Sequence, residues 1–146
     1  MASPASVGFD SAVATRLSRF VAAHPGLSAS AATNLLVDEA LRGQEHPLII
    51  FRDGPAGRRA RLIGGPDVWE VARAVRSSRT AEPDLDPEAL VELVADTSGV
   101  APRLVHAAID YWAAFADEID GWIARTEAET TEAEQRWHRE QALLGR

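Results

Sequence analysis

Polar and apolar residues alternate over positions 6–9, and this pattern predicts a short N-terminal strand with Val7 and Phe9 on one face. A helix is expected to follow from Asp10, an N-cap residue type, to about His24. Its apolar face consists of side chains at helical spacing: Val13, Leu17, Phe20 and Val21. Pro25-Gly26 then ends this helix.

A second helix is predicted to begin at Ser28 or Ser30 and to run to about Arg42, with Gly43 as its stop. Its apolar residues are Leu35, Leu36, Val37, Ala40 and Leu41. One strand and two helices in so short a segment cannot bury a sufficient core alone. We therefore expect this unit to form a homodimer or to dock on the remainder of the chain.

Residues 48–78 predict a β-hairpin that leads directly into a helix. The strand candidates are residues 48–51, an apolar run, and residues 59–63, and turn-forming types fill residues 53–57 between them. Gly64, Gly65 and Pro66 then break the chain. Asp67 is expected to cap a helix that continues to about Ser78.

Two further helices are predicted after a polar break at residues 77–84. Asp86 can cap the first, and Thr97-Ser98-Gly99 stops it. The second begins near Pro102 and is longer, with Gly121 as a position where it can bend. Its apolar stripe has spacings of three and four and comprises Leu104, Val105, Ala108, Ile109, Trp112, Phe115, Ile119, Trp122 and Ile123.

Composition indicates a folded protein without thiol chemistry. Hydrophobic residues make up 46% of the chain and charged residues 25%, as in globular domains. Cysteine is absent, which excludes disulfides, thiol nucleophiles and cysteine metal sites. No apolar run approaches the ~18 residues of a membrane span, and the N-terminus lacks the pattern of a secretory signal. We therefore expect a cytoplasmic protein.

The net charge of −7 is distributed unevenly along the chain. Residues 42–79 hold eight Arg and four acids, a net of +4, whereas residues 80–146 hold five Arg and fifteen acids, a net of −10. The basic segment, residues 42–79, can bind phosphate groups, whereas phosphate repels the acidic segment, residues 80–146. The candidates for contact with the DNA backbone are the arginines around the predicted turn: Arg52, Arg58, Arg59 and Arg61. A solvated turn with surface salt bridges is the alternative.

The strand–helix–helix order at the N-terminus, with Pro-Gly-Leu-Ser between the helices, resembles the ribbon–helix–helix family of DNA-binding repressors and antitoxins. The resemblance covers about residues 6–42. It implies that two chains pair their strands and that outward strand side chains, here Ser6, Gly8 and Asp10, face the major groove. Family members usually place long polar or basic side chains there, so we expect this unit to serve mainly for dimerisation.

Three helices after a β-hairpin, with a Thr-Ser-Gly turn between the last two, resemble a winged helix–turn–helix. Residues 48–116 are similar to a small winged-helix family found in antitoxins of PIN-nuclease modules. The resemblance implies a VapB-like type II antitoxin. In a helix–turn–helix, exposed residues at the start of the third helix read base edges. Arg103 and His106 are the candidates at that position.

The C-terminal segment is acidic and poor in apolar side chains. It would be a marginal helix alone and better ordered on a partner. Antitoxins of PIN-type toxins resemble one another in laying a C-terminal segment across the toxin, and this resemblance implies that Arg136 or Arg139 approaches the toxin's carboxylates. The toxin-binding candidates are Trp122, Arg136, Trp137, Arg139, Leu143 and Leu144. A frayed, solvent-exposed helix end is the alternative for the tail, and a core position is the simplest alternative for Trp122.

Catalysis is not expected, because no nucleophile–base arrangement can be assembled from the sequence. Glu134 and His138 could share a helix face, but two ligands do not make a metal site. Gly64-Gly65-Pro66 lacks the lysine and spacing of a phosphate-binding loop. We therefore expect no catalytic residues, no metal and no cofactor.

The resulting prediction is a mainly α chain with a short N-terminal strand and a β-hairpin. It comprises a ribbon–helix–helix-like dimerisation and DNA-binding unit (residues 1–45), a winged helix–turn–helix (46–118) and a C-terminal helical toxin-binding segment (119–146). The expected function is that of an antitoxin that neutralises a PIN-type ribonuclease and represses its own operon by binding operator DNA. A free-standing winged-helix transcriptional regulator and a dimeric interaction scaffold without DNA binding are the alternatives.

Overall fold

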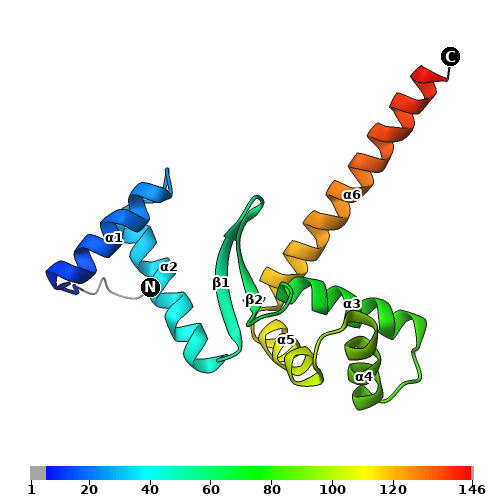
Figure 1. Ribbon diagram of the computed structural model, residues 1–146, viewed down its shortest axis with the longest axis horizontal. Coiled ribbons are helices and arrows are strands. Elements are labelled where there is room, and N and C mark those ends of the chain that lie inside the picture. The colour runs from blue at the N-terminus through cyan, green and yellow to red at the C-terminus, as the bar shows by residue number, and fades with distance from the viewer. Residues whose placement is uncertain (1–5, 146) are drawn as a thin grey trace. The chain divides into compact units, whose positions relative to one another are not determined.

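The computed structural model describes residues 6–145 and contains, among them, six helices and one two-stranded antiparallel sheet (Figure 1). The contacts divide the chain into two compact units, Met1–Glu45 and His46–Arg146. The prediction of a mainly α chain with one β-hairpin is therefore confirmed.

Two helices make up the first unit, α1 (Ser11–Ala23) and α2 (Ala29–Glu45). The Asp10 carboxylate accepts a hydrogen bond from a backbone amide in the first turn of α1 at 3.0 Å. The Ser28 hydroxyl does the same for α2 at 3.1 Å, so Ser28 rather than Ser30 caps this helix. Both helices thus begin where their capping residues predict.

Two expectations for the first unit are wrong. Gly43 does not stop α2, which continues to Glu45 and ends before Pro47, because the residue that precedes a proline disfavours the helical conformation. Residues 6–9 form no strand in the single chain, and their side chains are exposed. A strand needs a partner for its backbone groups, and within the described part of the chain only β1 (Ile49–Gly54) and β2 (Gly57–Leu62) pair.

The hairpin of the second unit has its core face and its solvent face set by the register of the two strands. The pairing runs from Ile49 opposite Leu62 to Gly54 opposite Gly57, with a two-residue connection. Ile49, Ala60 and Leu62 are buried on one face. The predicted strands are confirmed, and both extend further towards the turn than the apolar pattern indicates.

Three helices follow the hairpin: α3 (Val68–Ala81), α4 (Pro87–Ser98) and α5 (Pro102–Ala114). Helices α3 and α5 pack against the hairpin, and α4 packs against α3 and α5. Asp86 caps α4 as predicted, through a 2.9 Å bond to a backbone amide, and the left-handed φ of 71° at Gly99 ends it. The predicted break at residues 77–84 begins later, because α3 continues past Ser78 to Ala81.

The last helix, α6 (Ala116–Leu144), is separate from α5, so the single helix expected through residue 123 is wrong. Phe115 between them has φ −131° and ψ 49°, outside the helical region. The Tyr111 hydroxyl donates to Glu118 at 2.7 Å, and Trp112 Nε1 donates to Asp120 at 3.0 Å. These bonds fasten the start of α6 to α5 across the bend.

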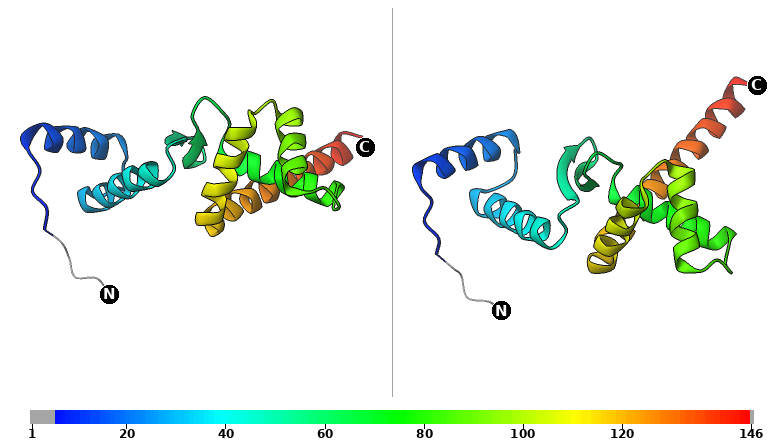
Figure 2. Two further views of the ribbon diagram at one scale, coloured as in Figure 1. Left: turned by 90° about the horizontal axis from the view of Figure 1, so that it is seen from below. Right: turned by 60° about the horizontal axis from the view of Figure 1, so that its bottom comes forward.

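The core of the second unit is built by the hairpin and by α3 to α6 together. Its largest fully buried side chains are Leu62, Val68, Val71, Val94, Val105, Tyr111, Ile119 and Ile123. Beyond residue 126 every described residue of α6 is exposed. Figure 1 and the right-hand view of Figure 2 show this part extending away from the other elements of its unit. The expected boundary between residues 118 and 119 lies inside α6.

Candidate functional site

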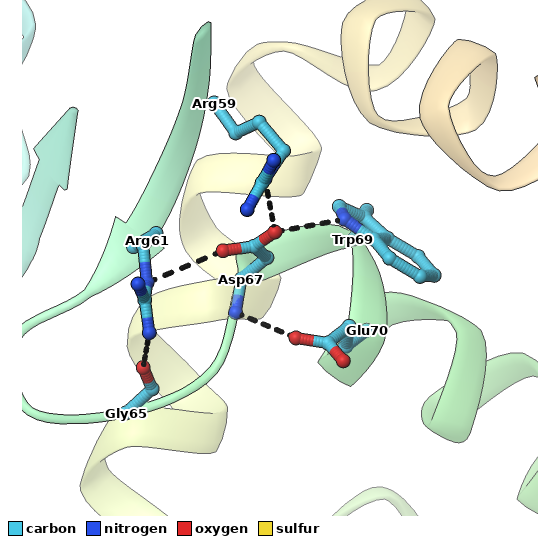
Figure 3. Close-up of polar contacts among 6 residues, drawn as sticks. All are labelled: Arg59, Arg61, Gly65, Asp67, Trp69 and Glu70. Atoms are coloured by element: carbon cyan, nitrogen blue, oxygen red, sulfur yellow. Dashed lines mark hydrogen bonds and ion pairs between the residues drawn. The ribbon is translucent and has the colours of Figure 1, made fainter. Parts of the chain in front are cut away.

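A buried carboxylate lies at the junction of the hairpin and α3. The Asp67 carboxylate accepts hydrogen bonds from Arg59 Nε and, at 3.1 Å, from Trp69 Nε1, and it forms an ion pair with Arg61 Nε at 3.3 Å (Figure 3). Asp67 is 5% exposed. Its own backbone amide donates to Glu70 Oε2 at 2.9 Å, so the same residue also caps α3. Two arginines and an indole thus neutralise and orient this carboxylate.

The strand register divides the four candidate arginines between the two faces of the hairpin. Because side chains alternate, Arg52, Arg59 and Arg61 share one face, and Arg52 lies directly opposite Arg59 in the register. Arg58 falls on the other face, where it pairs with Asp53 at 3.3 Å. The structure therefore brings three of the four arginines onto one face.

The arginines of this face differ in how far their charge is already used. Arg61 also donates to the Gly65 carbonyl at 3.2 Å, and the Arg59 guanidinium lies against the backbone at Gly54. Arg59 is therefore mainly a structural residue that joins the hairpin to α3. Arg52 is exposed, and the Arg61 side chain is partly exposed. These two remain the better candidates for contact with phosphate.

A groove of about 400 Å³ opens beside the hairpin turn. Its aromatic lining is Trp69 from α3 and Trp122 from α6. The Arg73 guanidinium lies 5.0 Å from the centroid of the Trp69 ring, and the Arg125 guanidinium lies 4.4 Å from that of Trp122, as in cation–π contacts. The Trp122 ring also packs against the turn, since a Cβ at Gly57 would lie 3.5 Å from it. Trp122, a predicted toxin-binding residue, is thus half-buried in the body of the second unit.

Helices α4 and α5, joined at Gly99, place the two other DNA-binding candidates on the surface. Arg103 lies in the first turn of α5 and is exposed. His106 Nε2 is 3.5 Å from the carboxylate of Glu88 on α4, and Asp110 one turn later pairs with His46 at 3.4 Å. Arg103 is therefore an exposed cation at the start of α5, whereas His106 already contacts a carboxylate.

The remaining toxin-binding candidates lie on the exposed part of α6. Trp137, Leu143 and Leu144 are 55%, 69% and 80% exposed, and Arg136 pairs with Glu132 at 3.4 Å. At ~100° per helical residue, Arg139 lies about 160° and Leu143 about 120° from Trp137. These candidates therefore do not form one face, although Trp137 and Leu144 do lie on the same side.

The sequence reasoning missed the cluster around Asp67, which it had recognised only as a helix cap. The available signal was an aspartate that follows a Gly-Gly-Pro break and is preceded by two arginines at alternate strand positions. Only the turn at residues 63–66 brings these groups together, because Arg61 and Asp67 are six positions apart along the chain.

The described residues were also searched for a metal site and for a membrane-spanning helix. No group of three or more histidine, aspartate or glutamate side chains among them is arranged to hold a metal ion. None of their helices is long and apolar enough to cross a membrane. Comparisons of the chain with protein-family models, with characterised proteins and with solved structures found no match.

Proposed function

We propose that this chain is a non-enzymatic, VapB-like antitoxin of the cytoplasm. It binds and neutralises a PIN-type ribonuclease through the exposed part of α6, and as a homodimer it represses its own operon by binding DNA. The proposal combines the sequence resemblances at residues 6–42 and 48–116 with three features of the fold.

The exposed part of α6 is the observation that carries the proposal. From residue 127 to Leu144 the helix has no buried residue, although Trp137 and two leucines lie within it. Isolated helices are marginal in water, and helical stability normally comes from packing of one face. Tryptophan and arginine dominate the binding energy of protein interfaces. A helix of this kind is best explained by a protein partner that covers it.

The first unit favours a homodimer. Among its described residues, 6–45, Ala32 is the only apolar side chain that is buried. An apolar groove of about 350 Å³ lies between α1 and α2 and is lined mainly by Phe9, Val13, Leu17, Phe20, Leu36 and Val37. A unit with so little core needs further apolar contact to be stable, and a second copy of the unit would supply it.

Binding to DNA is supported by two surfaces of the second unit. Arg103 lies in the first turn of α5, and in the proposed helix–turn–helix this helix would read bases from that end. Arg52 and Arg61 on the hairpin can contact phosphate and strengthen binding without reading sequence. The acidic α6 would be repelled by DNA, which leaves this helix to the protein partner.

Co-expression with the product of the adjoining reading frame tests neutralisation. We expect the full chain to form a stable complex with it and to restore growth. A chain that ends at Thr126 should lose both properties while keeping its fold, because the removed residues are exposed. A truncated chain that still binds and rescues growth would disprove the assignment to α6.

A mobility-shift assay with the chain's own promoter DNA tests repression. Joint replacement of Arg52 and Arg61 by Ala should weaken binding by roughly tenfold or more at low salt, since each phosphate contact adds to the salt-dependent term. Arg58→Ala is the matched control, because Arg58 lies on the other face and pairs with Asp53. Absence of any shift at low salt would exclude the repressor part.

A free-standing transcriptional regulator is the second candidate function. The proposed helix–turn–helix of α4 and α5, with Arg103 exposed at the start of α5, supports it independently of α6. A chain that binds promoter DNA but forms no complex with the product of the adjoining reading frame would fit this candidate and not the antitoxin.

A further inference from the structure

The side of α6 that is buried in the core at the start of the helix continues, as one narrow face, along the exposed part of the helix. Ile119 and Ile123, each 1% exposed, lie on the face that packs against the body. At spacings of three and four, and then seven, the same face continues through Thr126, Thr130, Ala133, Trp137 and Leu144. We call these five residues the outer stripe. It ends in the two large apolar side chains Trp137 and Leu144.

Carboxylates flank the outer stripe on both sides. At ~100° per residue, Glu127 and Glu134 lie about 60–90° to one side of its centre line, and Glu129 and Glu140 about 50–70° to the other. All four residues are exposed, and among the described residues none of the four carboxylates forms an ion pair or a hydrogen bond. An apolar strip with acidic edges is complementary to an apolar groove with a cationic rim.

The basic side chains of this part of α6 lie away from the outer stripe. Arg139 and Leu143 lie on the far side of the helix from Trp137, and Arg136 lies at its flank, paired with Glu132 at 3.4 Å. A partner seated on Trp137 therefore meets glutamates before it meets Arg139. This arrangement differs from the expectation that Arg136 or Arg139 approaches carboxylates of the partner.

We propose that the protein partner of α6 docks on the outer stripe and that its docking surface is an apolar groove edged by lysine or arginine. The inference rests on the proposed function for the existence of a partner and adds which face of the helix is used and which charge faces it. Trp137 and Leu144 fill the groove, Thr130 and Ala133 allow close approach of the backbones, and the four glutamates pair with its rim.

The test compares two variants of the full chain, each with one new arginine, on opposite sides of α6. Ala133→Arg puts a long charged side chain in the outer stripe, whereas Ala128→Arg places the same residue about 140° away at ~100° per residue. Both positions are exposed, so neither substitution should unfold the chain, and circular dichroism checks this. Affinity for the co-expressed product of the adjoining reading frame is then measured for each variant.

Ala133→Arg and Trp137→Ala should each weaken the complex by roughly tenfold or more, as truncation of an interface anchor does. Ala128→Arg should change the affinity by less than about twofold. Equal losses from Ala133→Arg and Ala128→Arg, with the complex of the unaltered chain intact, would overturn the choice of face and leave the antitoxin function standing. Failure of the unaltered chain to bind would overturn both.

Charge reversal tests the rim. Joint replacement of Glu127 and Glu134 by Arg should weaken binding several-fold and remove most of its salt dependence, whereas Arg139→Glu should leave both unchanged. The opposite result, a loss from Arg139→Glu alone, would show that the partner presents carboxylates and would overturn the proposal. A change in the chain's own oligomeric state caused by Ala133→Arg would also overturn the proposal, because the outer stripe would then bind a second copy of this chain.

Discussion

At the scale of single residues, Asp67 joins several polar partners through one buried carboxylate. Its carboxylate faces the guanidinium groups of Arg59 and Arg61 and the indole of Trp69, and it is almost fully buried. Removing one partner of a buried charge cluster is costly, because the remaining charges are left without compensation. This one side chain therefore joins Arg59 and Arg61 of β2 to the start of α3, in addition to the apolar core that the hairpin and α3 share.

We expect Asp67→Ala to lower the free energy of unfolding by about 3 kcal/mol, because it leaves two arginines side by side without their carboxylate. Urea denaturation followed by circular dichroism measures the loss. Asp53→Ala is the matched control, since its partly exposed pair with Arg58 should contribute no more than about 1 kcal/mol. Equal losses for the two variants would contradict the role assigned to Asp67.

At the scale of secondary-structure elements, two glycines illustrate how differently the hairpin and α6 depend on backbone conformation. Gly57 begins β2 with φ 125°, a region that side-chain-bearing residues rarely adopt. Its Cα also faces the ring of Trp122. Gly121 lies inside α6 with no atom near the position of a Cβ. The first glycine is required by the turn, and the second only weakens a helix.

We expect the same substitution to have opposite effects at these two positions. Gly57→Ala should lower the free energy of unfolding by about 1–3 kcal/mol through backbone strain. Gly121→Ala should raise it by about 0.5–1 kcal/mol, because alanine is the better helix former. Thermal and urea unfolding of both variants measure the changes. Destabilisation by Gly121→Ala would show that this glycine has a further role in α6.

At the scale of the whole molecule, the two units differ in how completely they bury their apolar side chains. The second unit has a shared core drawn from the hairpin and four helices. The first unit leaves Val13, Val37 and Leu41 exposed. An element with this much exposed apolar surface gains stability from association, and its apparent stability then depends on protein concentration.

We expect the chain to sediment as a dimer and its first unfolding transition to move to higher temperature as concentration rises. Each tenfold increase adds about 1.4 kcal/mol to the stability of a dimer. Leu17→Arg, which places a charge in the groove between α1 and α2, should abolish both effects. Ala22→Arg on an exposed position of α1 outside the groove lining is the control and should leave the dimer intact.

The caps show how much of the fold could be predicted from the sequence. Asp10, Ser28, Asp67 and Asp86 all stand at the N-cap positions where short-range patterns place them. The two strands of the hairpin follow from the same kind of pattern. These features depend on neighbours within about four positions, so the sequence alone determines them.

Tertiary structure decided the remaining features. Phe115 interrupts an unbroken apolar pattern, because α5 and α6 both have to pack against α3. Arg59 and Arg61 are drawn from the solvent to Asp67 because the turn at residues 63–66 folds α3 back onto the hairpin. Helix direction and charge pairing between distant residues depend on packing against the whole core. A local sequence pattern does not specify that packing, so helix direction and these charge pairs are determined only in the folded chain.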